Sequence, residues 1–286
     1  MTVPSGRVED RRRPEALSSS SRWLTWIVAV MWAAIGAVFF VAPSWSQERF
    51  PWKVSDFVTM TIGGWCLGTA FLAWWAARVW TWGAVHPCFV YLWAFGALEL
   101  GVALWFRDLL RTDQILTWPY LATIGMTVLA GAVGVIDVFR LRPSSSVDGP
   151  PVPGWVRVSA VVFVGFVGLL AVVAAIAPHL ALDGRVFPEP LSRFTLRAFG
   201  AFYLALAIGA IPVTLAKNLT PVRSYMASAM PLIVFITAAA FVYIDSFEIS
   251  EHPLQAIYIA AYLGVGIPSA YVLWRERSWA SAGAST

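Results

Sequence analysis

Glu99 is the residue whose position in this sequence most clearly points to chemistry. It lies in an apolar stretch, residues 79–106, in which His86 is the only other Asp, Glu, Lys, Arg or His. A charge near the centre of a bilayer costs about 2.5–3.5 kcal/mol, so such carboxylates usually face neighbouring helices and bind protons or cations. Gly96 and Ala103 share its helical face, and their small size predicts close packing there. Glu99 is therefore the first candidate for a buried polar site.

Arg197 is the candidate partner of that carboxylate. It precedes another apolar stretch, residues 198–216, and enters it from the side of the membrane nearer to Glu99. In an internal repeat described below, Glu99 corresponds to Ile236. Arg197 corresponds to Met60. An ion pair between the two would join the halves, and removing one partner of a buried pair costs about 3–5 kcal/mol. A structural ion pair and a functional acid are both open at this point.

Other catalytic or metal-binding arrangements are absent from the sequence. The histidines, His86, His179 and His252, fall in separate stretches, and the zinc spacings His-x-x-x-His and Cys-x-x-Cys do not occur. A glycine-rich phosphate-binding loop is also missing. Cys66 and Cys88 both fall within apolar stretches, which argues against a disulfide framework. The sequence therefore predicts a protein that is not an enzyme and holds neither cofactor nor metal.

The elements that must position Glu99 are membrane-spanning helices. Hydrophobic residues make up 59% of the chain, the mean hydropathy is +0.70 and 13% of residues are charged, whereas soluble domains average about 25% charged. Lipid offers the backbone no hydrogen-bond partners, so such stretches must be helical. A crossing needs about 20 apolar residues, and eight stretches qualify: residues 23–43, 57–77, 79–106, 115–136, 158–178, 198–216, 224–244 and 253–274. The predicted fold is an all-α, polytopic membrane bundle of eight transmembrane helices.

The distribution of charge predicts the orientation of this bundle. Alternating crossings leave 13 of the 20 basic residues on the side of the termini and place the others opposite: Arg49, Lys53, Arg107, Arg111, Arg185, Arg193 and Arg197. Positive charge accumulates in cytoplasmic loops, so we expect a plasma-membrane protein with both termini in the cytoplasm. Basic residues flank helices and form no single patch, which predicts the lipid bilayer and not nucleic acid as the partner. The near absence of lysine suggests a GC-rich bacterial genome.

The two halves of the sequence align with each other: a motif recurs at a constant offset of 137 residues, and other landmarks, such as Arg22 and Arg157, agree within two residues of that offset. Phe50, Pro51, Ser55 and Gly63 match Phe187, Pro188, Ser192 and Gly200. Four helices per half is an even number, so both halves enter the membrane from the same side and form parallel repeats. The predicted parts are a disordered cytoplasmic tail (1–21), a four-helix repeat (22–142), a Ser/Pro/Gly-rich cytoplasmic linker (143–154), a second four-helix repeat (155–277) and a cytoplasmic tail (278–286).

The repeated motif has a structural interpretation that requires no ligand. Proline disfavours helix in the residue before it, so each Phe-Pro pair turns the chain in an outer loop. Ser55 and Ser192 follow where an N-cap belongs. Gly64 and Gly68 are spaced four apart, and small residues at that spacing let helices approach closely in lipid. The motif therefore predicts how a helix starts and packs.

Two functions from different classes fit these observations. The first is a transporter of a small or lipid-like solute, with its site between the two repeats and Glu99 binding a proton or cation. The second is a non-catalytic accessory or assembly protein that docks other membrane proteins. Transport predicts a polar cavity between the repeats, whereas an accessory role predicts a packed interior; a membrane-embedded enzyme is a third and weaker alternative.

Overall fold

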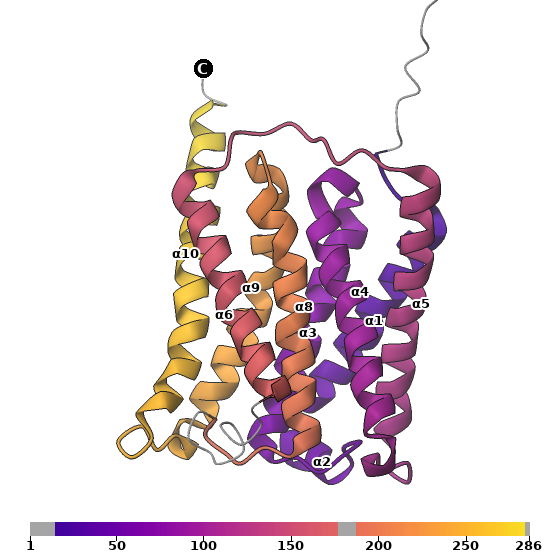
Figure 1. The fold of residues 1–286 in the computed structure, drawn as a ribbon, viewed down its shortest axis with the longest axis vertical. Coiled ribbons are helices and arrows are strands. Elements are labelled where there is room, and N and C mark those ends of the chain that lie inside the picture. Colours follow the sequence, from indigo (N-terminus) through magenta and orange to yellow (C-terminus); the bar gives the residue numbers. More distant parts are fainter. Residues whose placement is uncertain (1–14, 177–186, 284–286) are drawn as a thin grey trace, which may run out of the picture.

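Eight long apolar helices make up the protein in a computed structural model that describes residues 15–176 and 187–283 (Figure 1). No strand occurs in these two ranges. The helices are α1 (Ser19–Val41), α3 (Asp56–Val79), α4 (Trp82–Trp105), α5 (Thr117–Leu141), α6 (Gly154–Ile176), α8 (Arg193–Leu215), α9 (Leu219–Val242) and α10 (Ala256–Gly283). Each contains or adjoins a segment long and apolar enough to cross a membrane. The predicted all-α bundle with eight membrane-spanning helices is confirmed, and it is the architecture of a multi-pass membrane protein.

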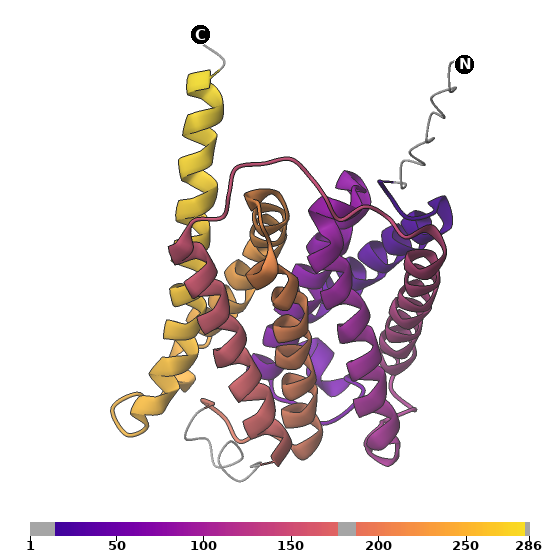
Figure 2. The same ribbon diagram turned by 45° about the horizontal axis from the view of Figure 1, so that its top comes forward.

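Short helices gather at one end of the bundle and the connection between α5 and α6 crosses the other. The short elements are α2 (Pro43–Glu48), η1 (Arg107–Leu109), η2 (Ile244–Ser246) and η3 (Pro253–Gln255). Figures 1 and 2 show the α5–α6 connection running over the end where α1 begins and α10 ends. The backbone of this connection is fixed, since Leu219 N–H donates to the Pro150 carbonyl at 2.8 Å and Thr220 Oγ1 donates to the Asp148 carbonyl at 2.8 Å.

The helices differ in how much of their surface faces other protein. In the most apolar segment of α3, 83% of the segment is buried inside the protein. The corresponding share is 22% for α6 and 28% for α10. The outward faces of the peripheral helices carry large apolar side chains, among them Val161, Leu169, Ile267 and Trp274. Exposed apolar surface on this scale requires a lipid environment. The centre of the bundle is therefore α3, and α6 and α10 lie at its edge.

The packing partners of the helices follow a regular order. The α3 helix packs against α1 and α9, and α8 packs against α6 and α4. The α5 helix covers α4 and α1, and α10 covers α9. Aromatic rings fill the space between α3 and α8: the Trp65 ring lies 4.1 Å from that of Phe202 with an interplanar angle of 4°. Phe199 packs edge-on against Trp65 at 4.3 Å.

The boundaries of the chain's outer parts differ from those predicted. Residues 1–14 and 284–286 lie outside the described residues, but α1 already begins at Ser19 and α10 continues through Gly283. At the start of α1, Ser18 caps the helix by accepting from Ser21 N–H. The Ser18 backbone N–H (3.0 Å) and Ser21 Oγ (2.5 Å) donate to Asp137 on α5. Hydropathy does not detect the first turn of α1 and the last turns of α10, because polar residues can be helical where the helix extends beyond the lipid.

Candidate functional site

Glu99 is buried in the middle of the bundle. It lies on α4 with 3% of its surface exposed. The neighbouring turn approaches α5 closely, because a Cβ on Gly96 would lie 2.7 Å from Thr127 Cγ2. This is the close packing that the small residues around Glu99 predict. The carboxylate is therefore held against other helices and away from lipid.

The two oxygens of the Glu99 carboxylate have different surroundings. Oε2 accepts from the Tyr120 hydroxyl of α5 at 3.4 Å, which is long for an O–H donor. Oε1 is buried and has no hydrogen-bond partner among the described residues. A buried polar atom without a partner costs about 1–3 kcal/mol, and more when it is charged. Glu99 thus has one weakly satisfied and one unsatisfied acceptor.

Glu99 lines a small closed cavity. The volume is about 10 Å³, which is close to the minimum that holds one water molecule. The walls come from five helices and from the segment before α3: Trp32, Trp52, Ile62, Trp65, Cys66, Phe95, Glu99, Tyr120 and Ala198. Each of these residues is less than 5% exposed. The cavity is therefore shut off from both membrane surfaces in this conformation.

Aromatic side chains form most of the cavity wall and support one another. The Trp32 ring contacts Phe95 at 5.3 Å and Tyr120 at 6.2 Å, and the Trp52 ring contacts Tyr120 at 5.5 Å. Trp32 Nε1 donates to Thr127 Oγ1 at 2.9 Å, and Trp52 Nε1 donates to Thr195 Oγ1 at 3.0 Å. Trp65 Nε1 is buried without a partner in the described part of the chain. The hydrogen bonds of Trp32 and Trp52 hold their indole rings in fixed orientations around the cavity.

Sequence reasoning did not identify the aromatic residues of this site. Of the 16 tryptophans, those that line the cavity all lie in the first half of the chain, where most of the tryptophans occur. That concentration is the one feature of the sequence that could have drawn attention to them. Tryptophan is also expected at both membrane surfaces, so the concentration alone does not distinguish a cavity wall from an interfacial belt.

Arg197 does not lie beside Glu99. Its Nη1 donates to the Ala174 carbonyl at 2.6 Å and to the neighbouring Ala175 carbonyl near the C-terminal end of α6. The next residue of α8, Ala198, is the one that lines the cavity. Successive residues of an α-helix point about 100° apart, so Arg197 faces α6 when Ala198 faces Glu99. The predicted ion pair is therefore wrong, and Arg197 satisfies helix-terminal carbonyls instead.

A double-mutant cycle will show little coupling between these two residues. Glu99→Gln and Arg197→Met change separate sites, so their effects on the free energy of unfolding should add to within about 0.3–0.5 kcal/mol. The measurement is unfolding of the two single variants and the double variant in detergent micelles. Recovery of stability in the double variant by more than about 1 kcal/mol, well outside that additivity range, would show that the side chains pair after all.

The residues of the repeated motif start and pack helices. Ser55 Oγ accepts from Val58 N–H at 3.2 Å, and Ser192 Oγ accepts from Thr195 N–H at 3.1 Å, so both serines are N-caps. The other motif positions pack nearby: Phe50 contacts Phe39, Phe187 contacts Phe199, Gly63 lies against α1 and Gly200 against α6. The carbonyl of Pro51 accepts from Arg111 N–H at 2.7 Å. Pro188 is the proline that matches Pro51 in the predicted repeat.

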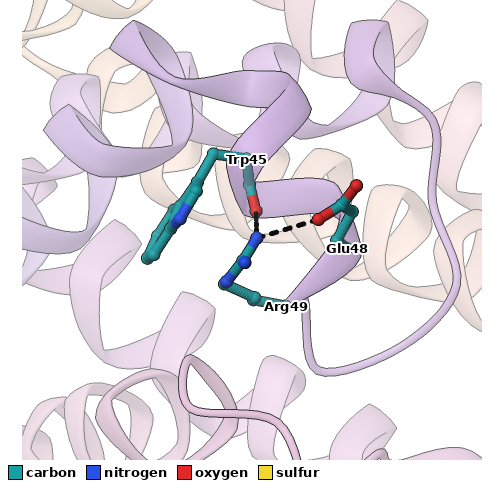
Figure 3. Close-up of polar contacts among 3 residues, drawn as sticks. All are labelled: Trp45, Glu48 and Arg49. Carbon is teal, nitrogen blue, oxygen red and sulfur yellow. Dashed lines mark hydrogen bonds and ion pairs between the residues drawn. The ribbon is translucent and has the colours of Figure 1, made fainter.

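A second polar region lies on the surface at the α2 end. Arg49 Nη1 donates to the Trp45 carbonyl and to Glu48 Oε2, both at 2.9 Å, while its guanidinium lies 4.6 Å from the Trp45 ring centre (Figure 3). A hollow of about 480 Å³ opens nearby and is lined by Gln47, Glu48, Lys53, Val54 and Arg111. These side chains of both signs are accessible to water, which makes the region an ordinary hydrated loop surface.

Carboxylates and a histidine also come together in the loop before α10. Ligand atoms of Glu248, Glu251 and His252 lie within 4.8 Å of one another, but both carboxylates are exposed. His252 Nε2 is 3.7 Å from Glu248 Oε2, an ion pair of low energetic value at the surface. The buried cavity at Glu99 is the stronger candidate.

Comparison of the chain with models of protein families, with curated proteins and with solved structures found no match.

Proposed function

We propose that the bundle consists of two parallel four-helix repeats, α1–α5 and α6–α10, related by an approximate two-fold axis along the membrane normal. The packing order supports this arrangement. The pair α1–α3 corresponds to α6–α8, α3–α9 corresponds to α8–α4, and α4–α5 corresponds to α9–α10; all six pairs are in contact. Contacts that recur in this order are what a duplicated unit produces.

Contacts between individual residues support the same proposal. Trp65 and Phe202 differ by 137 positions, the offset of the repeat, and their rings stack in parallel. A Cβ on Gly63 would lie 2.6–3.0 Å from atoms of Phe39 and Phe40 on α1, and one on Gly200 would lie 2.9 Å from Ala174 Cβ on α6. Phe39 and Ala174 occupy matching positions at an offset of 135. The two-fold axis would then pass between the stacked rings.

The proposed setting is the plasma membrane of a bacterium, with the termini and the α5–α6 connection in the cytoplasm. The excess of basic residues on that side supports this orientation. The start of α1, the end of α10 and the α5–α6 connection lie at one end of the bundle (Figure 1). Arg78, Arg140 and Arg142 are among the basic residues at the cytoplasmic helix ends.

We propose that the protein transports a small solute, with Glu99 as the site that binds a proton or cation. The observation that carries this proposal is the Glu99 carboxylate with an unpartnered oxygen in a buried cavity that the first half lines together with one residue of the second. Its walls come from α1, α3, α4, α5 and the segment before α3 in the first half, and from Ala198 in the second. Movement of the halves against each other would open the cavity to one side of the membrane and then to the other.

The alternative is an accessory protein that docks other membrane proteins. The small volume of the cavity, about 10 Å³, favours it, because a site with a solute in transit needs more space. A transporter in its closed state has the same appearance. The two proposals differ in whether the cavity ever opens.

Cys66 provides a direct test of whether the cavity opens, because it is one of the residues of the cavity wall and carries a thiol. We expect small, charged methanethiosulfonate reagents to modify Cys66 from either side of sealed membrane vesicles when Cys88 is replaced by serine. Cys88 is equally buried but lies outside the cavity wall, against Ser228. A variant with Cys88 alone, made by Cys66→Ser, is therefore the matched control and should react much more slowly. Modification of Cys66 from neither side of the folded protein would reject transport and favour the accessory role.

A further inference from the structure

The cavity at Glu99 combines a few polar atoms with walls that are mostly aromatic. Its oxygen atoms come from the Glu99 carboxylate and the Tyr120 hydroxyl, and Trp32, Trp52, Trp65 and Phe95 supply four further rings. Oε1 of Glu99 has no partner among the described residues. The volume admits one particle about as large as a water molecule. The wall residue Trp65 also carries a buried donor without a partner in the described chain, its Nε1. A ligand that satisfies Glu99 must be small and must supply a hydrogen-bond donor or a positive charge.

No basic side chain of the described chain lines the cavity. Arg197, the basic residue that the sequence suggested as the partner of Glu99, binds carbonyls at the end of α6 instead. An ionised Glu99 in this position therefore has no counterion in the cavity wall, and a buried charge without a partner is costly. Charge balance requires a proton on Glu99 or a cation beside it.

The composition of the walls selects among cations. Calcium takes 6–8 oxygen ligands and magnesium needs nearly ideal octahedral coordination. The carboxylate and the hydroxyl supply too few oxygen atoms for either. A cation that donates hydrogen bonds and also interacts with ring faces suits the cavity better, since aromatic rings attract ammonium groups within about 6 Å of their centres.

We propose that this cavity binds a single ammonium ion, which donates a hydrogen bond to Glu99 Oε1 and rests against the surrounding rings. The ion matches a water molecule in size and provides the missing donor and the missing charge together. Its role as a transported solute rests on the proposed function, whereas its binding can be measured separately. A lone water molecule is the alternative occupant. It can donate to Oε1 and, unlike ammonium, can accept from a donor such as Trp65 Nε1, but it leaves the charge of the carboxylate uncompensated.

Thermal unfolding of the purified protein in detergent tests the inference, because a ligand that binds the folded state stabilises it. We expect ammonium chloride to raise Tm saturably at constant ionic strength. Sodium chloride should give no such rise, magnesium chloride should give none for lack of oxygen ligands, and tetramethylammonium chloride should give none because the cavity is too small. The apparent Kd for ammonium should weaken by at least about tenfold in Glu99→Gln. The control Glu48→Gln removes an exposed carboxylate and should respond like the wild type.

Equal Tm shifts in all four salts, or an unchanged ammonium response in Glu99→Gln, would overturn the inference and leave water as the occupant. Should Glu99→Gln fail to fold, Glu99→Asp keeps the charge but shortens the side chain, and it should show weaker yet saturable binding. An ammonium-dependent shift without Cys66 modification from either side would support the site and reject transport. Cys66 modification without an ammonium response would support transport and reject the ammonium site.

Discussion

Replacing Trp52 with alanine lowers the free energy of unfolding by about 3–5 kcal/mol, the range for removing a large buried aromatic side chain. Trp52 is 2% exposed, and its ring stacks on Phe194 of α8 at 4.1 Å. It also contacts Phe50 at 4.6 Å and Tyr120 at 5.5 Å. Its Nε1 donates to Thr195 Oγ1, a bond that crosses from the segment before α3 to α8. Unfolding by SDS titration from detergent micelles measures the change.

Two further variants separate the causes of this loss. Trp52→Phe keeps most of the packing but removes the hydrogen bond to Thr195, so we expect an intermediate loss. Trp105→Ala removes a tryptophan that is 83% exposed and should cost much less. Equal losses in Trp52→Ala and Trp105→Ala would contradict the central packing role of Trp52.

Gly68→Ala will destabilise the bundle by about 1–3 kcal/mol, the usual cost of overpacking. A Cβ at Gly68 would lie 2.3 Å from Leu232 Cβ and 2.5 Å from Leu232 Cα. The second of these atoms belongs to the backbone, so α3 and α9 would have to move apart. The same titration in SDS measures the effect, and Leu232→Ala should restore little of the loss because the clash with the α9 backbone remains.

Gly125→Ala is the matched control for this substitution. No heavy atom lies within 4 Å of the position of its Cβ. Alanine at a compatible helical position usually stabilises a protein by about 0.4–1 kcal/mol. If Gly68→Ala proved as stable as Gly125→Ala, α3 and α9 would not approach each other closely at Gly68.

The sequence was sufficient to predict the helices because lipid imposes one solution on a long apolar stretch. The position of each span follows from hydropathy, but the ends of the helices do not. At one terminus, Ser19 begins α1 four residues before the predicted span, and at the other α10 continues through Gly283. Polar residues extend these helices into the region beyond the lipid, where hydropathy carries no information.

The burial of Glu99 could also be predicted, whereas its neighbours could not. Depth along a helix follows from counting residues, and it placed Glu99 and Arg197 at similar levels. The direction of a side chain around the helix axis depends on how each helix is rotated relative to its neighbours. On α8, Ala198 lines the cavity, whereas the preceding residue, Arg197, contacts α6. Tyr120 was missed for the same reason, since its contact with Glu99 joins two helices.

Infrared spectroscopy of Glu99 in D₂O tests the central claim most directly, because it follows the carboxyl group itself. In the absence of ammonium, the difference spectrum between the wild type and Glu99→Gln should contain the carbonyl band of a neutral carboxyl group. We expect that band to shift on exchange of its proton for deuterium while the protein stays folded, because the cavity opens to water during the proposed cycle. A band that shifts only when the protein unfolds would contradict the account, since Glu99 would then lie in a permanently closed interior.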